Sequence, residues 1–84
     1  MKQYRAEIDV MPLKEILDPQ GKAVRISMRN LELTAVTDVR IGKHISMLIT
    51  AANEAGAREI AETACRKMLA NPVMEYFELK ISEE

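Results

Sequence analysis

The chain opens with a strict alternation of apolar and polar residues from Gln3 to Val10. Tyr4, Ala6 and Ile8 are separated by charged side chains, and the same spacing continues to Val10. A period of two places alternate side chains on opposite faces of a strand. This segment is therefore predicted to be a β-strand with one buried face.

A helix is predicted to begin at Pro19 and to run to about Leu31. Asp18 can accept hydrogen bonds from the free N–H groups of the first turn, and proline is well tolerated at the first helical position. Val24 and Met28 lie four residues apart and Leu31 follows three later, which gives the helix one apolar stripe. Such a stripe is expected to pack against a sheet.

A second helix is predicted from a cap at Asn53 to about Ala70. Its end is marked by Asn71-Pro72, because asparagine tolerates the left-handed conformation after a helix and proline cannot continue one. Its apolar stripe comprises Ala57, Ile60, Ala61, Ala64, Cys65 and Met68.

Three further strands are predicted. Two lie between Val36 and Thr50, with Val39 and Ile41 on one face of the first and Ile45, Met47 and Ile49 on one face of the second, and Gly42-Lys43 is interpreted as the hairpin turn between them. The last strand runs from Val73 to Ile81.

The predicted order is βαββαβ, so residues 1–84 are expected to form a single α+β domain of the ferredoxin-like type. In that fold two right-handed crossovers place both helices on one face of a four-stranded antiparallel sheet. The other face is expected to be bare. The residues predicted on it are mostly polar: Arg5, Glu7, Asp9, Asp38, Arg40, His44, Ser46, Tyr76, Glu78 and Lys80.

Composition excludes several classes of function. Twelve basic and thirteen acidic side chains give a net charge of -1, so neither nucleic acid nor an anionic membrane is an expected partner. No segment approaches the length of a membrane span. One cysteine cannot form an internal disulfide, which fits a cytoplasmic protein, and one histidine with one cysteine do not supply the set of soft ligands that a zinc site needs.

No catalytic group is predicted. Cys65 and His44 are the one conceivable nucleophile and base, but their positions place them on opposite sides of the sheet. Cys65 is interpreted as a buried thiol and His44 as a surface residue. Arg40-Ile41-Gly42-Lys43 lacks the glycine-rich loop and following helix of a phosphate site.

Three segments in register nevertheless resemble the PurS family, the small subunits of phosphoribosylformylglycinamidine (FGAM) synthase. They are Leu17-Asp18-Pro19-Gln20-Gly21-Lys22-Ala23-Val24, Val36-Thr37-Asp38-Val39-Arg40-Ile41-Gly42-Lys43 and Met68-Leu69-Ala70-Asn71-Pro72-Val73-Met74-Glu75-Tyr76. The motif positions expected to shape the fold or its contacts are Asp18, Pro19, Gln20, Gly21, Arg40, Gly42, Lys43, Asn71 and Pro72. Leu31-Glu32-Leu33 departs from a Leu-Gly-aromatic sequence frequent in similar chains, and glycine there would favour a left-handed helix cap.

The resemblance implies a non-catalytic subunit of a glutamine-dependent, ATP-using ligase complex of purine biosynthesis. It implies that the chain joins a glutaminase subunit to a synthetase subunit and assists ammonia transfer. ATP and magnesium are expected on the synthetase subunit, and no cofactor is expected in this chain. The alternative from the residues alone is a free-standing regulatory domain that binds a small effector.

Self-association is also expected, as a dimer or a tetramer. A chain of 84 residues buries a modest core, and its sheet would keep one uncovered face. Pairing at an open strand edge is one route, with polar pairs around a small apolar patch near Leu48 or Tyr76.

Overall fold

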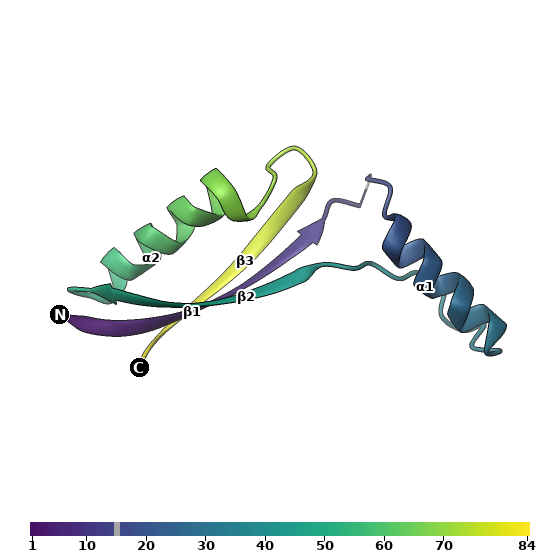
Figure 1. Cartoon of the computed structure of the whole chain (residues 1–84), viewed down its shortest axis with the longest axis horizontal. Helices are drawn as coiled ribbons and strands as arrows, with labels where there is room; N and C mark the ends of the chain where they lie inside the picture. The colour runs from purple at the N-terminus through teal and green to yellow at the C-terminus, as the bar shows by residue number, and fades with distance from the viewer. Residues whose placement is uncertain (15) are drawn as a thin grey trace.

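The computed structural model describes residues 1–14 and 16–84. Three strands form one antiparallel sheet in the order β2-β1-β3. β1 (Lys2–Pro12) lies in the centre, β2 (Lys43–Ala51) pairs along one side of it, and β3 (Glu75–Glu83) pairs along the other. Figure 1 shows these strands as one curved layer.

α2 (Glu54–Ala64) covers one face of this sheet (Figure 1). Asn53 accepts a hydrogen bond from Gly56 N–H, as expected of the cap. The helix buries Ala57 and Ala61 completely against Tyr4 and Ala6, because alanine allows a helix backbone to approach a sheet closely. The predicted cap is therefore confirmed, and so is the apolar stripe at Ala57, Ala61 and Cys65, whereas Ile60 and Met68 are exposed, contrary to the prediction.

The last turn of this helix is a π-helical segment, η1 (Cys65–Leu69), which ends in a hydrogen bond from Ala70 N–H to the Cys65 carbonyl. Cys65 is fully buried in an apolar cluster with Ile8, Val10 and Ala70. Burial raises the pKa of its thiol. Cys65 is thus a packed core residue, as predicted.

α1 (Pro19–Asn30) lies away from the sheet, and the chain returns from it through residues 31–42 (Figure 1). We call residues 19–41 the arm. Its helix buries only Gly21, and Leu31 remains 72% exposed. The radius of gyration is 16.5 Å, compared with about 12 Å for a compact domain of this length.

The prediction of a four-stranded sheet with both helices on one face is wrong. The α+β class and the residue ranges of the two helices hold, but α1 does not pack on the sheet and Gly42-Lys43 is not a hairpin turn. Residues 36–41 continue away from the sheet beside α1, and only α2 covers the apolar face. The strand predicted over Val36–Ile41 is absent because hydrogen bonds tie Arg40 and Ile41 to the segment before α1.

The end of α1 shows the effect of the missing glycine. Glu32 adopts φ 66°, and it is the one non-glycine residue with positive φ among residues 1–14 and 16–84. Leu31 N–H and Leu33 N–H both donate to the Met28 carbonyl, and these two hydrogen bonds end the helix on either side of Glu32. The left-handed cap is therefore kept, with glutamate in a conformation that glycine adopts more easily.

Candidate functional site

The two chain segments that connect the sheet to α1 are held together by Asp18 and Arg40, in a region that we call the neck. It consists of Leu13, Lys14, Ile16, Asp18, Gly21, Val39, Arg40, Ile41 and Gly42. Asp18 accepts from Gly21 N–H at 3.0 Å and from Ile41 N–H at 2.8 Å. These two backbone N–H groups lower the pKa of the Asp18 carboxyl. One side chain therefore caps the helix and anchors the returning segment.

Arg40 fixes the same junction from the other side. Its guanidinium donates to the carbonyls of Lys14 at 3.1 Å and Ile16 at 3.4 Å, and also to that of Leu13. A planar guanidinium can satisfy several carbonyls at once, which a lysine ammonium does less well. Arg40 is thus part of the neck, and the prediction that Asp38 and Arg40 lie on the polar sheet face is wrong.

Two glycines allow the segments of the neck to approach. A Cβ on Gly21 would overlap the Val39 carbonyl, and a Cβ on Gly42 would overlap the Val10 carbonyl and the Met11 sulfur. Neither glycine has a positive φ, so close backbone approach is the reason for glycine at both positions. The motif positions Asp18, Gly21, Arg40 and Gly42 are therefore brought together as one structural unit.

The remaining motif positions lie around this junction. Pro19 and Gln20 form the exposed first turn of α1, and Lys43 begins β2. Asn71 and Pro72 lie in the turn before β3, where the Asn71 side chain accepts from Val73 N–H. Leu13 N–H donates to the Met74 carbonyl, which ties that turn to the end of β1. All three motif segments therefore meet at one end of the sheet.

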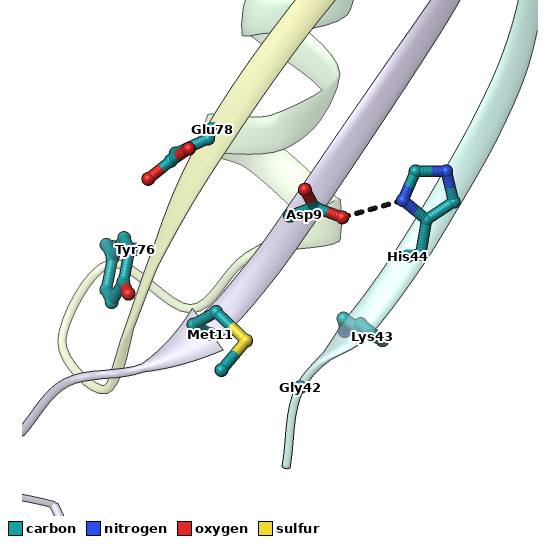
Figure 2. Close-up of a pocket in the computed structure, with 7 residues that line it drawn as sticks. All are labelled: Asp9, Met11, Gly42, Lys43, His44, Tyr76 and Glu78. Carbon is teal, nitrogen blue, oxygen red and sulfur yellow. Dashed lines mark hydrogen bonds and ion pairs between the residues drawn. The ribbon is translucent and has the colours of Figure 1, made fainter. Parts of the chain in front are cut away.

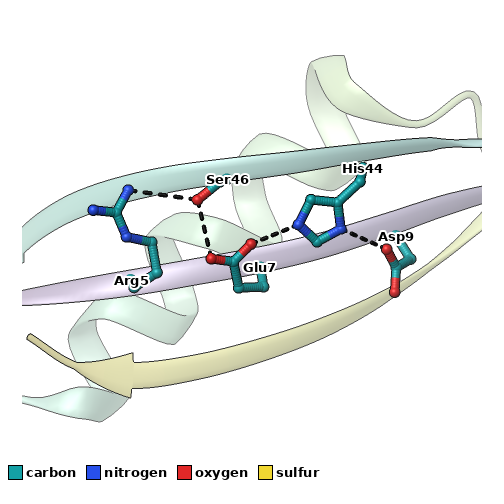
Figure 3. Close-up of polar contacts among 5 residues, drawn as sticks. All are labelled: Arg5, Glu7, Asp9, His44 and Ser46. Atoms are coloured by element: carbon teal, nitrogen blue, oxygen red, sulfur yellow. Dashed lines mark hydrogen bonds and ion pairs between the residues drawn. The ribbon is translucent and has the colours of Figure 1, made fainter.

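The uncovered face of the sheet carries a chain of polar contacts across β1 and β2 (Figure 3). His44 lies between two carboxylates, with Nδ1 2.6 Å from Asp9 and Nε2 2.6 Å from Glu7. The Ser46 hydroxyl donates to the other carboxylate oxygen of Glu7 at 3.0 Å and accepts a hydrogen bond from the Arg5 guanidinium at 3.4 Å. The prediction that these side chains share the bare face is confirmed.

The carboxylates raise the pKa of His44, with Asp9 the larger cause and Glu7 the next. His44 in turn lowers the pKa of Glu7, helped by the hydroxyl of Ser46. The residue types were visible in the sequence, but the histidine bridge depends on the β1–β2 register, in which Asp9 is opposite His44. That register could not be read from a pattern of alternation alone.

An open hollow of about 370 Å³ continues this face toward the neck. It is lined by Asp9, Met11, Gly42, Lys43, His44, Tyr76 and Glu78, which Figure 2 shows along all three strands. Charges of both signs surround it, and Tyr76 is 45% exposed. Small-molecule pockets are more enclosed and more apolar, whereas mixed charge around an aromatic residue is typical of protein interfaces.

The cysteine and the histidine lie on opposite faces of the sheet. Cys65 packs on the covered side among Ile8 and Val10, while His44 contacts Glu7 and Asp9 on the uncovered side. No three His, Cys, Asp or Glu side chains among residues 1–14 and 16–84 are placed to hold a metal ion. The described part of the chain also has no helix long and apolar enough to span a membrane.

Comparison with known proteins gives a consistent result. The family model PurS, described as phosphoribosylformylglycinamidine (FGAM) synthase, matches residues 5–83. The chain belongs to the PurS family. The PurS subunit of FGAM synthase from Synechocystis is 37% identical over 94% of this chain and 79% of its own length, and that from Methanocaldococcus jannaschii is 30% identical over 95% and 96%.

Solved PurS structures share the whole architecture, arm included. Bacillus subtilis PurS is 31% identical, covers 95% of this chain and 99% of its own, and has a TM-score of 0.85. A chain in the structure of PurLQS from Thermotoga maritima is 32% identical, covers both chains completely and has a TM-score of 0.86. The family resemblance expected from the three motifs is therefore confirmed, and the chain is a subunit of FGAM synthase in purine biosynthesis.

Proposed function

We propose that this chain joins the glutaminase and synthetase subunits of FGAM synthase and assists the passage of ammonia between them. The complex uses glutamine and ATP to convert formylglycinamide ribonucleotide, an amide, into the amidine FGAM. The observation that carries the proposal is the match over the full length to a chain of the Thermotoga maritima PurLQS structure.

The proposed role is non-catalytic. A nucleophile needs a neighbouring base, and the sheet separates the thiol of Cys65 from the imidazole of His44. The Cys65 thiol is also buried and its pKa is raised, which disfavours the reactive thiolate. A cytoplasmic location is part of the proposal, since this free thiol is compatible with a reducing compartment.

ATP and magnesium belong, in this proposal, to the synthetase subunit. Nucleotide phosphates are commonly held by a glycine-rich loop that leads into a helix. The first helix here is preceded by Asp18, whose carboxylate already accepts the hydrogen bond from Gly21 N–H. That negative charge at the helix N-terminus would repel a phosphate, so α1 offers no anion site.

The uncovered sheet face is the proposed contact surface for the larger subunits. Its ordered polar network around Glu7 and His44 presents fixed charges, and Tyr76 and the 49% exposed Leu48 add apolar area. Interfaces of complexes that assemble and separate combine such polar pairs with a small apolar centre. Their stability is expected to fall as salt is added.

Co-purification tests the proposal against the alternative of a free-standing effector-binding domain. The chain should co-elute with the glutaminase and synthetase subunits in the presence of glutamine and a nucleotide. Alone, it should turn over neither glutamine nor ATP. Saturable binding of an amino acid by the isolated chain, without any association with those subunits, would establish the alternative and reject the proposal.

A further inference from the structure

His44 lies in a position where both of its ring nitrogens need a proton. Nδ1 is 2.6 Å from a carboxylate oxygen of Asp9, and Nε2 is 2.6 Å from one of Glu7 (Figure 3). An ionised carboxylate can only accept hydrogen bonds, and a neutral imidazole has a single N–H. Both contacts therefore exist together only while His44 is a doubly protonated imidazolium. The raised pKa of His44 agrees with this geometry. We call these three side chains the His44 bridge.

Loss of the proton breaks one of the two contacts, and the contact to Asp9 is the one expected to break. The Ser46 hydroxyl also donates to Glu7, so Glu7 stays beside Nε2 and the remaining proton is retained there. Asp9 accepts from no other donor in the described part of the chain, and its side chain is 63% exposed. Glu78 lies opposite Asp9 in the β1–β3 register, and like charges in such a pair repel. The Asp9 carboxylate is therefore expected to turn away into water.

The same step changes the charge of the hollow on the uncovered face (Figure 2). Two acidic and two basic side chains line it, namely Asp9, Glu78, Lys43 and His44. Their charges cancel while His44 is protonated, and a net charge of about -1 remains when it is neutral. The other charged side chains that face this side of the sheet are Arg5, which is paired with Glu84, and Glu7 and Lys80. α2 packs on the opposite side of the sheet (Figure 1).

We propose that the His44 bridge makes the binding of the larger subunits dependent on pH. With the proton bound, the bridge holds Glu7 and Asp9 in place and keeps the hollow neutral. When the proton is lost, Asp9 is released and the face binds those subunits less tightly. This regulation rests on the proposed function, because it concerns the surface assigned there to the glutaminase and synthetase subunits.

The direction of the effect follows from the order of the side chains before binding. In the bridged form three side chains are already fixed, so a partner that fits them does not have to order them. In the released form, binding must also desolvate an Asp9 carboxylate that has lost its charged partner. A partner that binds the bridged form has an apparent affinity proportional to the bridged fraction. Above the midpoint of the His44 titration, that fraction falls about tenfold for each pH unit.

Binding and titration are measured together to test this regulation. Dissociation constants for the glutaminase and synthetase subunits, with glutamine and a nucleotide present, would be measured from about pH 6 to about pH 9 for wild type and His44→Gln. The ratio of the two constants removes pH effects that arise in the larger subunits. NMR of the imidazole gives the midpoint without ambiguity, because the chain has one histidine. The expected result is a constant ratio below that midpoint and a loss of wild-type affinity of about tenfold per pH unit above it.

Two substitutions on the same face distinguish the bridge from the general charge of the surface. Asp9→Asn removes the larger cause of the raised pKa of His44, so the NMR midpoint and the binding profile should both move to lower pH. Glu78→Gln removes an acid of the same hollow that makes no hydrogen bond to His44, and it should move both by less.

The possible failures are distinct. A midpoint at or below pH 6.5 in wild type would overturn the bridge itself. Association that is present but has the same pH profile in wild type and His44→Gln would overturn the regulation alone. Absence of association at every pH would overturn the proposed function, and the regulation with it.

Discussion

Arg40→Met tests whether the neck stabilises the arm separately from the sheet. The substitution keeps much of the apolar stem and removes the three hydrogen bonds to the carbonyls of Leu13, Lys14 and Ile16. Hydrogen bonds from a charged donor contribute roughly 1.5–3 kcal/mol each when buried. Because these are only partly buried, we expect a total loss of about 2 kcal/mol in the free energy of opening the neck.

Hydrogen exchange measured by NMR reports this loss residue by residue. A loss of about 2 kcal/mol corresponds to about thirtyfold faster exchange, since 1.4 kcal/mol is tenfold. The amides of Gly21 and Ile41, which donate to Asp18, should show it, and those of the central strand β1 should not. Arg40→Lys should fall between wild type and Arg40→Met, because an ammonium replaces fewer of the bonds.

The oligomeric state of each variant should be checked by sedimentation at the concentration used for NMR. Equal acceleration in β1 and in the neck would show that Arg40 supports the whole fold. Unchanged exchange at Gly21 and Ile41 would show that the neck does not depend on the guanidinium. Either result would refute the reasoning that assigns Arg40 to the arm.

Three further substitutions, the first with a control at an exposed position, test other parts of the structure. Ile8→Ala in the fully buried centre of β1 should lower the free energy of unfolding by about 2–5 kcal/mol in urea, whereas Leu48→Ala on the exposed face should change it by less than about 0.5 kcal/mol; similar losses would contradict the placement of the core. Glu32→Gly should raise the thermal midpoint through about 1 kcal/mol of relieved backbone strain, and a lowered midpoint would argue against the left-handed cap. Wild type should have a higher free energy of unfolding than His44→Gln. This difference should be complete below pH 6.5, the ordinary pKa of histidine, and should be lost as pH rises through the raised pKa of His44 in the folded protein. Because the pKa of Glu7 is lowered from 4.5, its share of the advantage is lost only as pH falls below that value; a pH-independent difference between the two proteins would contradict the bridge.

The local elements could be predicted from the sequence because each depends on neighbouring residues. The alternation around Ile8 and the caps at Asp18 and Asn53 are short-range signals, and the structure contains all three. Cys65 could be assigned to the core for the same reason, since helical spacing alone placed it on the apolar stripe.

The arm could not be predicted because it depends on contacts between distant residues. Gly42-Lys43 has the composition of a turn, but the chain continues without a turn because Arg40 donates hydrogen bonds to the carbonyls of Leu13 and Lys14. Every residue has a backbone carbonyl, so the sequence does not indicate which carbonyls Arg40 contacts. Asp18 could be predicted as a helix cap, but its grouping with Gly21, Arg40 and Gly42 rested on family resemblance alone, and the structure supplies the physical reason for that grouping. The His44 bridge similarly required the strand register.

Reconstitution of the synthase from its separate subunits tests the central claim most directly. FGAM formation would be measured with glutamine and with ammonia as nitrogen source, in mixtures of the glutaminase and synthetase subunits with and without this chain. Omission of the chain should abolish the glutamine-dependent reaction and spare much of the ammonia-dependent one. Equal loss of both reactions, or full glutamine-dependent activity without the chain, would contradict a role in coupling the two subunits.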